Sequence, residues 1–177
     1  MKKVFLLLIP VLLFSGCFGP DQPDYLGGEI MIVSSSVFSE GSLIPSKYSC
    51  DGEDKNPELT IKDIPEGTKF LALIVDDPDA PGGTWTHWTV WNIPVTGNEM
   101  KLEENSVPGV QGTNDFGKLN YGGPCPPSGT HRYFFKVYAL DSELDLAEGA
   151  SVSELYKALN EIKPLGQGAL MGKYKRE

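Results

Sequence analysis

The chain is poor in basic residues and in histidine. Its 177 residues hold 15 lysines and arginines against 24 aspartates and glutamates, a net charge of -9. This balance has the wrong sign for a protein that coats nucleic acid or adheres to anionic headgroups, so we expect no nucleic-acid partner. Only two histidines are present, His87 and His131, and any site built on imidazole depends on them.

Beyond the N-terminus the chain lacks a long apolar run. Lys2 and Lys3 precede an apolar stretch from Val4 to Phe14, and small residues then lead to Cys17. The stretch is shorter than the roughly 20 residues of a spanning helix, and its order is typical of a secretory signal. Small residues before a cysteine resemble a lipoprotein signal, so we expect cleavage after residue 16 and lipidation of Cys17. An ordinary cleaved signal and an uncleaved anchor are the alternatives.

These features predict three parts: a lipoprotein-type signal peptide at 1–16, a lipid-anchored tether at 17–28 and one domain at 29–177. The tether contains Gly, Pro, Asp and Gln, as short spacers do. We expect an exported lipoprotein on the outer face of the cell membrane, which it contacts only through the N-terminal lipid, or else a secreted protein.

Helical periodicity is also scarce, since strand-like runs and turns alternate from Glu29 onward. This pattern predicts a mainly β fold, an antiparallel sandwich. Ser151 to Asn160 is the one helix, with a capping box of Ser151 and Glu154 and an apolar stripe. We expect strands in the runs 31–33, 59–61, 70–75, 86–94, 131–140 and 169–174, a short apolar run at 43–44, a turn at 166–168, and a loop or irregular strand over 98–120.

Two strands carry the histidines. Alternation along 86–94 puts His87, Thr89 and Trp91 on one face and Trp88 and Val90 on the other. Along 131–140 it puts His131 and Tyr133 on the same face.

Four polar residues come from strand ends beside loops rich in Pro and Gly: Asp77, His87, His131 and Tyr133. Converging polar groups on rigid loops are typical of a small-ligand pocket, and imidazole and phenol donors suit an anion. We expect Asp77 to hold a histidine in one tautomer or to accept from a ligand's ammonium group. The alternative is that each histidine is structural and bonded to a carbonyl.

Backbone groups add to this prediction. The N–H groups of Gly122, Gly123 and Cys125 are expected to form a nest of further donors for the anion.

The remaining charged residues near this cluster have structural interpretations. Asp76 and Asp79 are expected to cap turns and loops. Arg132 is expected to pair with a carboxylate on the outer side of the sheet.

Two cysteines remain after Cys17. For an exported domain we prefer a disulfide between Cys50 and Cys125 over two buried thiols.

Three segments together resemble the signature regions of a known family: Asp76 to Pro81, Trp85 to His87, and Gly123 to Tyr133. The family is that of the phosphatidylethanolamine-binding proteins, also called Raf kinase inhibitor-like proteins. The forms around Cys50 and Cys125 are similar to those of its bacterial and archaeal branch. The resemblance runs from about Ser34 to Tyr174.

The resemblance implies a β-sandwich of two antiparallel sheets, with a short helix near the C-terminus and a small anion pocket at one end. It implies ligand-binding roles for residues that match the family's pocket: Asp77, Pro81, His87, Cys125, His131 and Tyr133. Phosphate and phosphoethanolamine-like groups are the implied ligands, without a cofactor. Some members inhibit kinases or serine proteases, so a serine protease is a second candidate partner.

Two enzymatic alternatives remain. Cys125 or Ser128, with His131 and Asp77, has the residue types of a hydrolase, but no nucleophile elbow surrounds them. His87, His131 and Asp77 could ligate a metal, although they lack short metal-type spacing. We therefore expect a binding protein with neither catalysis nor a metal.

Overall fold

Residues 28–176 are described by the computed structural model, and they form two β-sheets with one α-helix. The predicted signal at 1–16, Cys17 and the tether up to residue 27 lie outside the described residues. Within residues 28–176 no helix is both long and apolar enough to cross a membrane.

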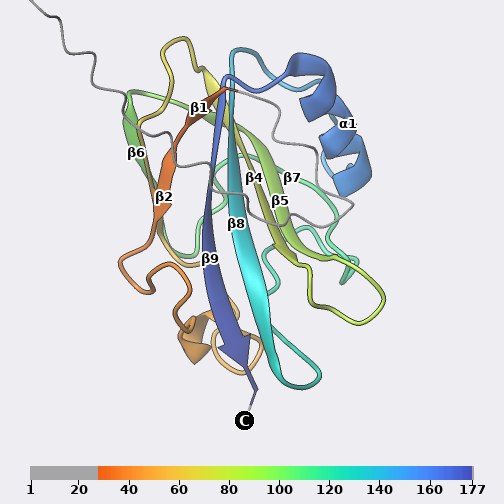
Figure 1. Cartoon of the computed structure of the whole chain (residues 1–177). Helices are drawn as coiled ribbons and strands as arrows, with labels where there is room; N and C mark the ends of the chain where they lie inside the picture. Colours follow the sequence, from red (N-terminus) through yellow and green to blue (C-terminus); the bar gives the residue numbers. More distant parts are fainter. Residues whose placement is uncertain (1–27, 177) are drawn as a thin grey trace, which may run out of the picture.

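The larger sheet has six strands in the order β1-β9-β8-β4-β5-β7 (Figure 1). Four long strands form its centre: β4 (Phe70–Asp77), β5 (Trp85–Pro94), β8 (Thr130–Leu140) and β9 (Gly166–Lys175). Two short strands form its edges, β1 (Glu29–Ile30) and β7 (Val110–Gln111). Neighbours are antiparallel except β1 and β9, which run parallel.

The smaller sheet has three antiparallel strands in the order β2-β3-β6. They are β2 (Ile32–Ser34), β3 (Leu59–Lys62) and β6 (Glu99–Leu102). A short 3-10 helix, η1 (Ser46–Tyr48), lies between β2 and β3 in the chain. The two sheets thus form the predicted mainly β fold, with the single helix near the C-terminus.

Each face of the larger sheet is covered by a different layer. The inner face packs against the smaller sheet in one core that includes Leu73, Val75, Phe135 and Ile61. The outer face carries a second cluster that includes Ile74, Trp91 and the helix residue Leu155. Strands β4, β5 and β8 are therefore buried on both faces, which explains the continuous apolar run at 70–75.

Helix α1 (Val152–Ile162) begins as the sequence predicts. The Ser151 side chain accepts from the backbone of Glu154, and the Glu154 carboxylate accepts from the Ser151 backbone, which completes the capping box. Leu155 and Leu159 are its buried residues. Ser151 is therefore the N-cap of α1.

The segment 98–120, expected as a loop or irregular strand, contains the two short strands β6 and β7, and in the apolar run at 43–44 Leu43 forms an isolated bridge to Lys173. One expectation about strands was wrong, because residues 166–168, expected as a turn, begin β9. The two glycines there permit close approach of the N-terminal strands, since a Cβ on Gly168 would lie 2.3 Å from the Met31 carbonyl oxygen.

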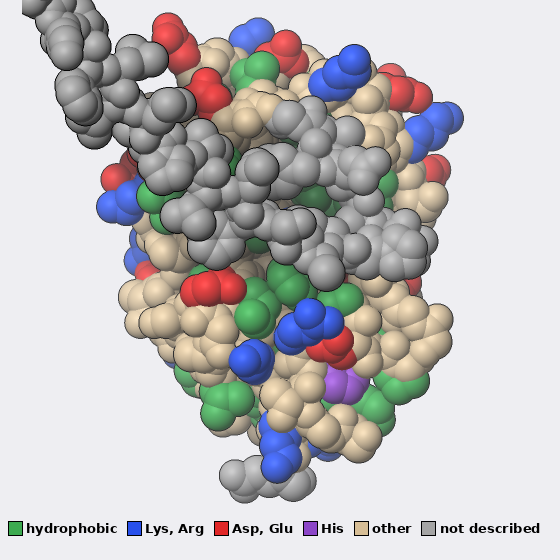
Figure 2. All heavy atoms as spheres, viewed as in Figure 1, with side chains coloured by type: hydrophobic (Ala, Val, Ile, Leu, Met, Phe, Trp, Pro, Cys, Tyr) green, Lys and Arg blue, Asp and Glu red, His purple; other side chains and the backbone are tan. Residues whose placement is uncertain are grey.

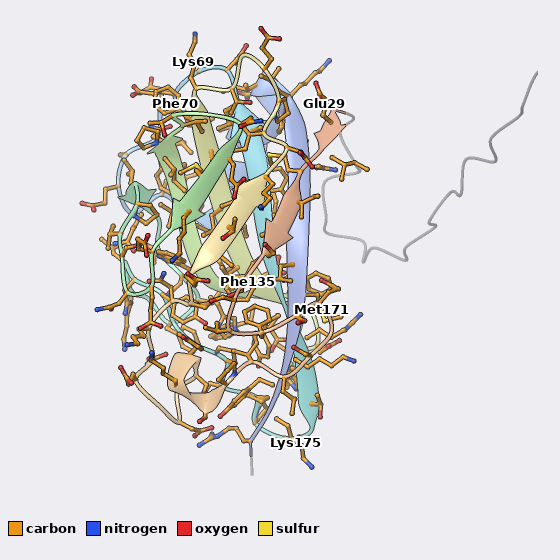
Figure 3. All side chains as sticks on the ribbon, turned by 90° about the vertical axis from the view of Figure 1, so that its left-hand side faces the viewer. Glu29, Lys69, Phe70, Phe135, Met171 and Lys175 are labelled. Carbon is orange, nitrogen blue, oxygen red and sulfur yellow. A yellow bond between two sulfur atoms is a disulfide. The ribbon has the colours of Figure 1, made fainter. Side chains whose placement is uncertain are left out.

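Charged side chains of both signs are interspersed over the face shown in Figure 2. The ends of the sandwich are distinct: Lys69 and Phe70 lie at one end and Lys175 at the other (Figure 3). Because β4 runs from Phe70 to Asp77 and pairs antiparallel with β5 and β8, the end of β4 meets the starts of β5 and β8 at the end where β9 finishes. The predicted site residues belong to this end.

Candidate functional site

The register of the larger sheet places four predicted residues on one face at this end. His131 and Tyr133 pair with Tyr174 and Gly172 on β9, and Tyr133 belongs to the inner core. Asp77 lies on the same face, because its neighbour Asp76 pairs with Phe134 on the outer face. The shared face predicted for His131 and Tyr133 is therefore observed.

His87 reaches this inner face through a β-bulge. Val75 pairs with Trp88 and Asp76 with Thr86, so one step on β4 spans two residues on β5. The additional residue shifts the alternation, and the His87 ring lies 5.2 Å from the Tyr133 ring in an edge-to-face arrangement. Bulges redirect side chains in this way near functional sites.

The predicted face of His87 was therefore wrong. Strict alternation grouped it with Thr89 and Trp91, but Trp91 packs in the outer cluster while His87 contacts the inner one. The position of the extra residue is set by the hydrogen bonds between β4 and β5, so the alternation of side chains along β5 does not reveal where the bulge lies.

Asp77 and His131 form a buried pair. The Nδ1 of His131 donates to Oδ2 of Asp77 at 2.7 Å, and the other carboxylate oxygen accepts from the Asp79 backbone at 2.8 Å. Both oxygens of Asp77 thus have partners. The expected tautomer-holding role of Asp77 fits this geometry, and Nε2 of His131 is the nitrogen left to meet a ligand.

His87 is held by a carbonyl. Its Nδ1 lies 2.6 Å from the carbonyl oxygen of Gly122, which can only accept, so Nδ1 carries the proton. Burial lowers the pKa of His87, and the Gly122 hydrogen bond and the charge of Asp77 only partly offset this effect. His87 is therefore neutral near pH 7, and its Nε2 is an acceptor.

The hydroxyl of Tyr133 is buried and has no hydrogen-bond partner within residues 28–176. Burial raises the pKa of Tyr133 far above its ordinary value, and the nearby Asp77 carboxylate raises it further. Leaving a buried hydroxyl unpaired costs about 1–3 kcal/mol. The cluster thus contains a neutral O–H donor to which the described part of the chain offers no hydrogen-bond acceptor.

The cluster is nearly enclosed. Asp77 and His87 are each 3% exposed, Tyr133 is 0% exposed, and His131, at 8%, is the most accessible member. A histidine side chain is visible at the surface in Figure 2, toward the end at which β9 terminates.

The other two predicted ligand residues lie in the surrounding loops. Pro81 is exposed in the loop between β4 and β5, outside the buried cluster. Cys125 is partly exposed in the loop before β8 and forms a disulfide with Cys50, with 5.5 Å between the Cα atoms. Because that sulfur is bonded, Cys125 offers no free thiolate nucleophile, which removes one of the two considered for a hydrolase.

The predicted nest of backbone donors is mostly used internally. The Gly122 N–H donates to the His87 carbonyl at 3.0 Å, and the Gly123 N–H donates to Oδ1 of Asp54 at 2.6 Å. The expectation of three donors was therefore wrong for Gly122 and Gly123, because the loop satisfies these groups itself. Only the Cys125 N–H remains of the three.

Asp76 does not cap a turn, contrary to expectation. It lies within β4, 2% exposed, and forms a buried ion pair with Lys136 on the outer face of the sheet. Burial raises the pKa of Asp76, and the Lys136 ammonium opposes that rise. Strand β4 extends two residues beyond its apolar run, so this carboxylate became part of the sheet.

Asp79 and Arg132 pair at the loop. The Arg132 backbone N–H donates to Oδ2 of Asp79 at 3.0 Å and its Nε donates to the same oxygen at 2.8 Å. This pair lowers the pKa of Asp79. Arg132 thus binds a carboxylate, as expected, and that carboxylate belongs to the loop between β4 and β5.

An aromatic residue that the sequence did not single out, Phe116, packs between His87 and Trp85. The Phe116 ring lies 5.3 Å from the His87 ring and 5.5 Å from Trp85, in both cases edge to face. Phe116 is 41% and Trp85 37% exposed, so both reach the surface beside the cluster. Phe116 comes from a segment without periodicity, and no sequence signal marked it.

A separate open cleft of about 110 Å³ is lined by residues that include Asp54, Trp88, Gln111 and Tyr121. None of the six predicted ligand residues lines it. The described residues also contain no group of three or more His, Cys, Asp or Glu side chains placed to hold a metal ion.

Fold and site together define a class of protein: a β-sandwich that gathers two histidines, an aspartate and a tyrosine at one end of its larger sheet. Residues 34–175 match the family described as phosphatidylethanolamine-binding protein. The chain belongs to this family.

The relatives come from archaea and bacteria. A UPF0098 protein of Pyrococcus abyssi is 46% identical over the whole of both chains, and one of Aquifex aeolicus is 50% identical over 85% of this chain and 92% of its own. A crystal structure of a putative phosphatidylethanolamine-binding protein homolog from Chlamydia trachomatis superposes with a TM-score of 0.77 at 38% identity, covering 85% of this chain and all of that one. The crystal structure of Escherichia coli YbcL superposes with a TM-score of 0.76 at 33% sequence identity, covering 83% of this chain and 99% of that one.

Proposed function

We propose that this chain is an exported, membrane-anchored binding protein that recognises a small phosphate-bearing or similar anionic group through His87, His131 and Tyr133. The Tyr133 hydroxyl carries the proposal, because a buried donor without a hydrogen-bond partner among residues 28–176 is what a bound anion would satisfy. Family membership supports a ligand of this class.

The hydrogen bonds of the two histidine rings decide which ring nitrogens remain for a ligand. Nδ1 of both histidines is committed to Asp77 or to Gly122, so the two Nε2 atoms remain for a ligand. Nε2 of neutral His87 is an acceptor and would bind a ligand hydroxyl, such as the P–OH of a singly protonated phosphate. Tyr133 would donate to an unprotonated oxygen of the same group.

A tyrosine variant tests the assignment. Tyr133→Phe removes the unpaired hydroxyl, so the free protein should be at least as stable as wild type. Its affinity for phosphate or phosphoethanolamine should fall by about tenfold or more, because a hydrogen bond to a charged group contributes about 1.5–3 kcal/mol. The matched control is Tyr138→Phe, on the same strand but in the outer cluster, which should leave affinity unchanged.

Histidine NMR signals provide the direct measurement. Titration with phosphoethanolamine should perturb the ring resonances of His87 and His131 in wild type. An absence of perturbation at both rings, or equal affinity of the two tyrosine variants, would refute anion binding at this site.

Protease inhibition is a second candidate, favoured by the exposed loop residues 127–129 next to the cluster. Stoichiometric inhibition of a chymotrypsin-like protease, lost when this loop is shortened, would support it. Export and anchoring through Cys17 are tested separately by mass spectrometry of the protein from its own cell, where an intact Met1 terminus would contradict them.

A further inference from the structure

The loop at 121–127, here called the site loop, is held by residues 46–54, here called the bracing loop. A disulfide joins Cys50 to Cys125, two residues 75 positions apart in the sequence. Beside it, the Cys50 N–H donates to the Pro124 carbonyl at 3.2 Å and the Asp54 carboxylate accepts from the Gly123 N–H at 2.6 Å. The bracing loop therefore contacts three consecutive residues of the site loop.

These contacts fix the one backbone donor that residues 122–127 of the site loop have left. Its three prolines, at 124, 126 and 127, carry no N–H, and the N–H groups of Gly122 and Gly123 are used internally. The Cys125 N–H remains, close enough to the Tyr133 hydroxyl to oppose the rise in its pKa, although the hydroxyl forms no hydrogen bond within residues 28–176. The residue that carries this donor is the one that the disulfide holds.

The bracing loop is itself attached to the strands of the site. The Tyr174 hydroxyl donates to Oδ2 of Asp51 at 3.0 Å, and Arg176 Nε donates to the other oxygen at 3.1 Å. Tyr174 pairs with His131 across β8 and β9. The disulfide therefore connects the site loop to a loop that is tied to β9, the strand that pairs with the β8 residues His131 and Tyr133.

The disulfide is open to a reductant, since Cys50 is exposed and Cys125 is partly exposed. A thiolate of a dithiol can attack Sγ of Cys50, the S–S bond breaks, and Cys125 leaves as a thiolate that takes up a proton. The second thiol of the dithiol then attacks the mixed disulfide and releases Cys50 as a thiol. Two electrons pass from the dithiol, which ends as its own disulfide, to the protein.

We propose that Cys50, acting through its disulfide with Cys125, is a positioning residue of the anion site and makes anion affinity depend on the thiol–disulfide state of the protein. This proposal rests on the proposed function, because its affinity measurement requires that the site bind an anion. Reduction leaves only hydrogen bonds between the two loops, so the Cys125 donor loses its fixed place beside Tyr133.

Titration with inorganic phosphate tests the proposal in three forms of the protein: oxidised wild type, wild type reduced by a dithiol, and Cys50→Ala. The alanine variant removes the disulfide and leaves the site loop sequence intact. Both forms without the disulfide should bind about tenfold more weakly, the factor expected for one lost hydrogen bond to a charged group. Reoxidation should restore the affinity of wild type and leave Cys50→Ala weak.

A control separates positioning from general stability. Ser151→Ala weakens the cap of α1, away from the site, and should keep the affinity of oxidised wild type despite its lower stability. Near-ultraviolet circular dichroism shows that each form is folded at the assay temperature. Equal affinity in the oxidised, reduced and Cys50→Ala forms would overturn the proposal.

Amide hydrogen exchange provides a readout that needs no ligand. Loss of the disulfide should accelerate exchange at Gly123 and Cys125 while the amides of β4 remain protected. If oxidised protein binds no phosphate, the proposed function fails, and faster exchange at these two amides still supports the positioning role. Unchanged exchange at both amides refutes it.

Discussion

Replacing Lys136 by methionine should destabilise the domain strongly, because it leaves the Asp76 carboxylate buried without its partner. The Lys136 and Asp76 side chains are only 7% and 2% exposed, and Oδ1 of Asp76 already has no partner within the described residues. Methionine keeps most of the length and volume of lysine, so the substitution removes the charge and opens little space.

The size of the expected loss can be calculated because the buried Asp76 carboxylate, once without its partner, can take up a proton and become neutral. Protonating an aspartate of ordinary pKa, about 3.9, costs about 4.2 kcal/mol at pH 7, at about 1.36 kcal/mol per pH unit. This cost is a ceiling for the charge penalty, and broken buried ion pairs cost about 3–5 kcal/mol. We therefore expect Lys136→Met to lose about 3–4 kcal/mol, a fall in Tm of roughly 10 °C for a domain of this size.

Urea unfolding at two pH values provides the assay. At pH 5 the cost of protonating an aspartate of ordinary pKa is about 1.5 kcal/mol, so the stability loss of Lys136→Met should shrink by more than half. The matched control is Lys62→Met, whose ion pair with Glu99 is about half exposed and should be worth less than about 1 kcal/mol. The double change Asp76→Asn with Lys136→Met should recover much of the loss. A penalty equal to that of Lys62→Met, or one independent of pH, would refute the buried ion pair.

Two further predictions concern the helix and the pH response. Ser151→Ala removes the side-chain half of the capping box and should cost about 0.5–2 kcal/mol in unfolding free energy, whereas Ser153→Ala, exposed in the first turn of the helix, should cost little. Burial lowers the pKa of His87, so as the pH falls through about 6.5 the His87 imidazole takes up a proton in the unfolded chain before it does so in the folded domain. The free energy of unfolding should therefore decline below that pH. His87→Gln should remove this part of the pH dependence. An unfolding free energy that stays flat from pH 7 to 5.5 in wild type and variant alike would contradict the buried neutral histidine.

Much of the fold could be read from local patterns. The apolar run at 70–75 and the alternation along 131–140 predicted the two central strands, and Ser151 with Glu154 predicted the start of the helix. These signals are local, since side-chain period and capping depend on residues a few positions apart. For the same reason His131 and Tyr133 could be placed on one face before their neighbours were known.

Other features depend on which strands become neighbours. Alternation placed His87 on the wrong face, and only the pairing of β5 with β4 introduces the bulge that turns it toward Tyr133. Asp76 was interpreted as a turn residue, and only the pairing of β4 with β8 brings Lys136 beside it.

Local sequence patterns were sufficient for the long strands that contain residues 70–75, 86–94 and 131–140, for the helix cap and for the candidate groups of the site, because each depends on residue type and short spacing. They left open which face His87 presents, which donors the site loop retains and which charges are buried in pairs. The physical reason is that hydrogen bonds between distant segments set the register of the sheet, and the register decides where each side chain points.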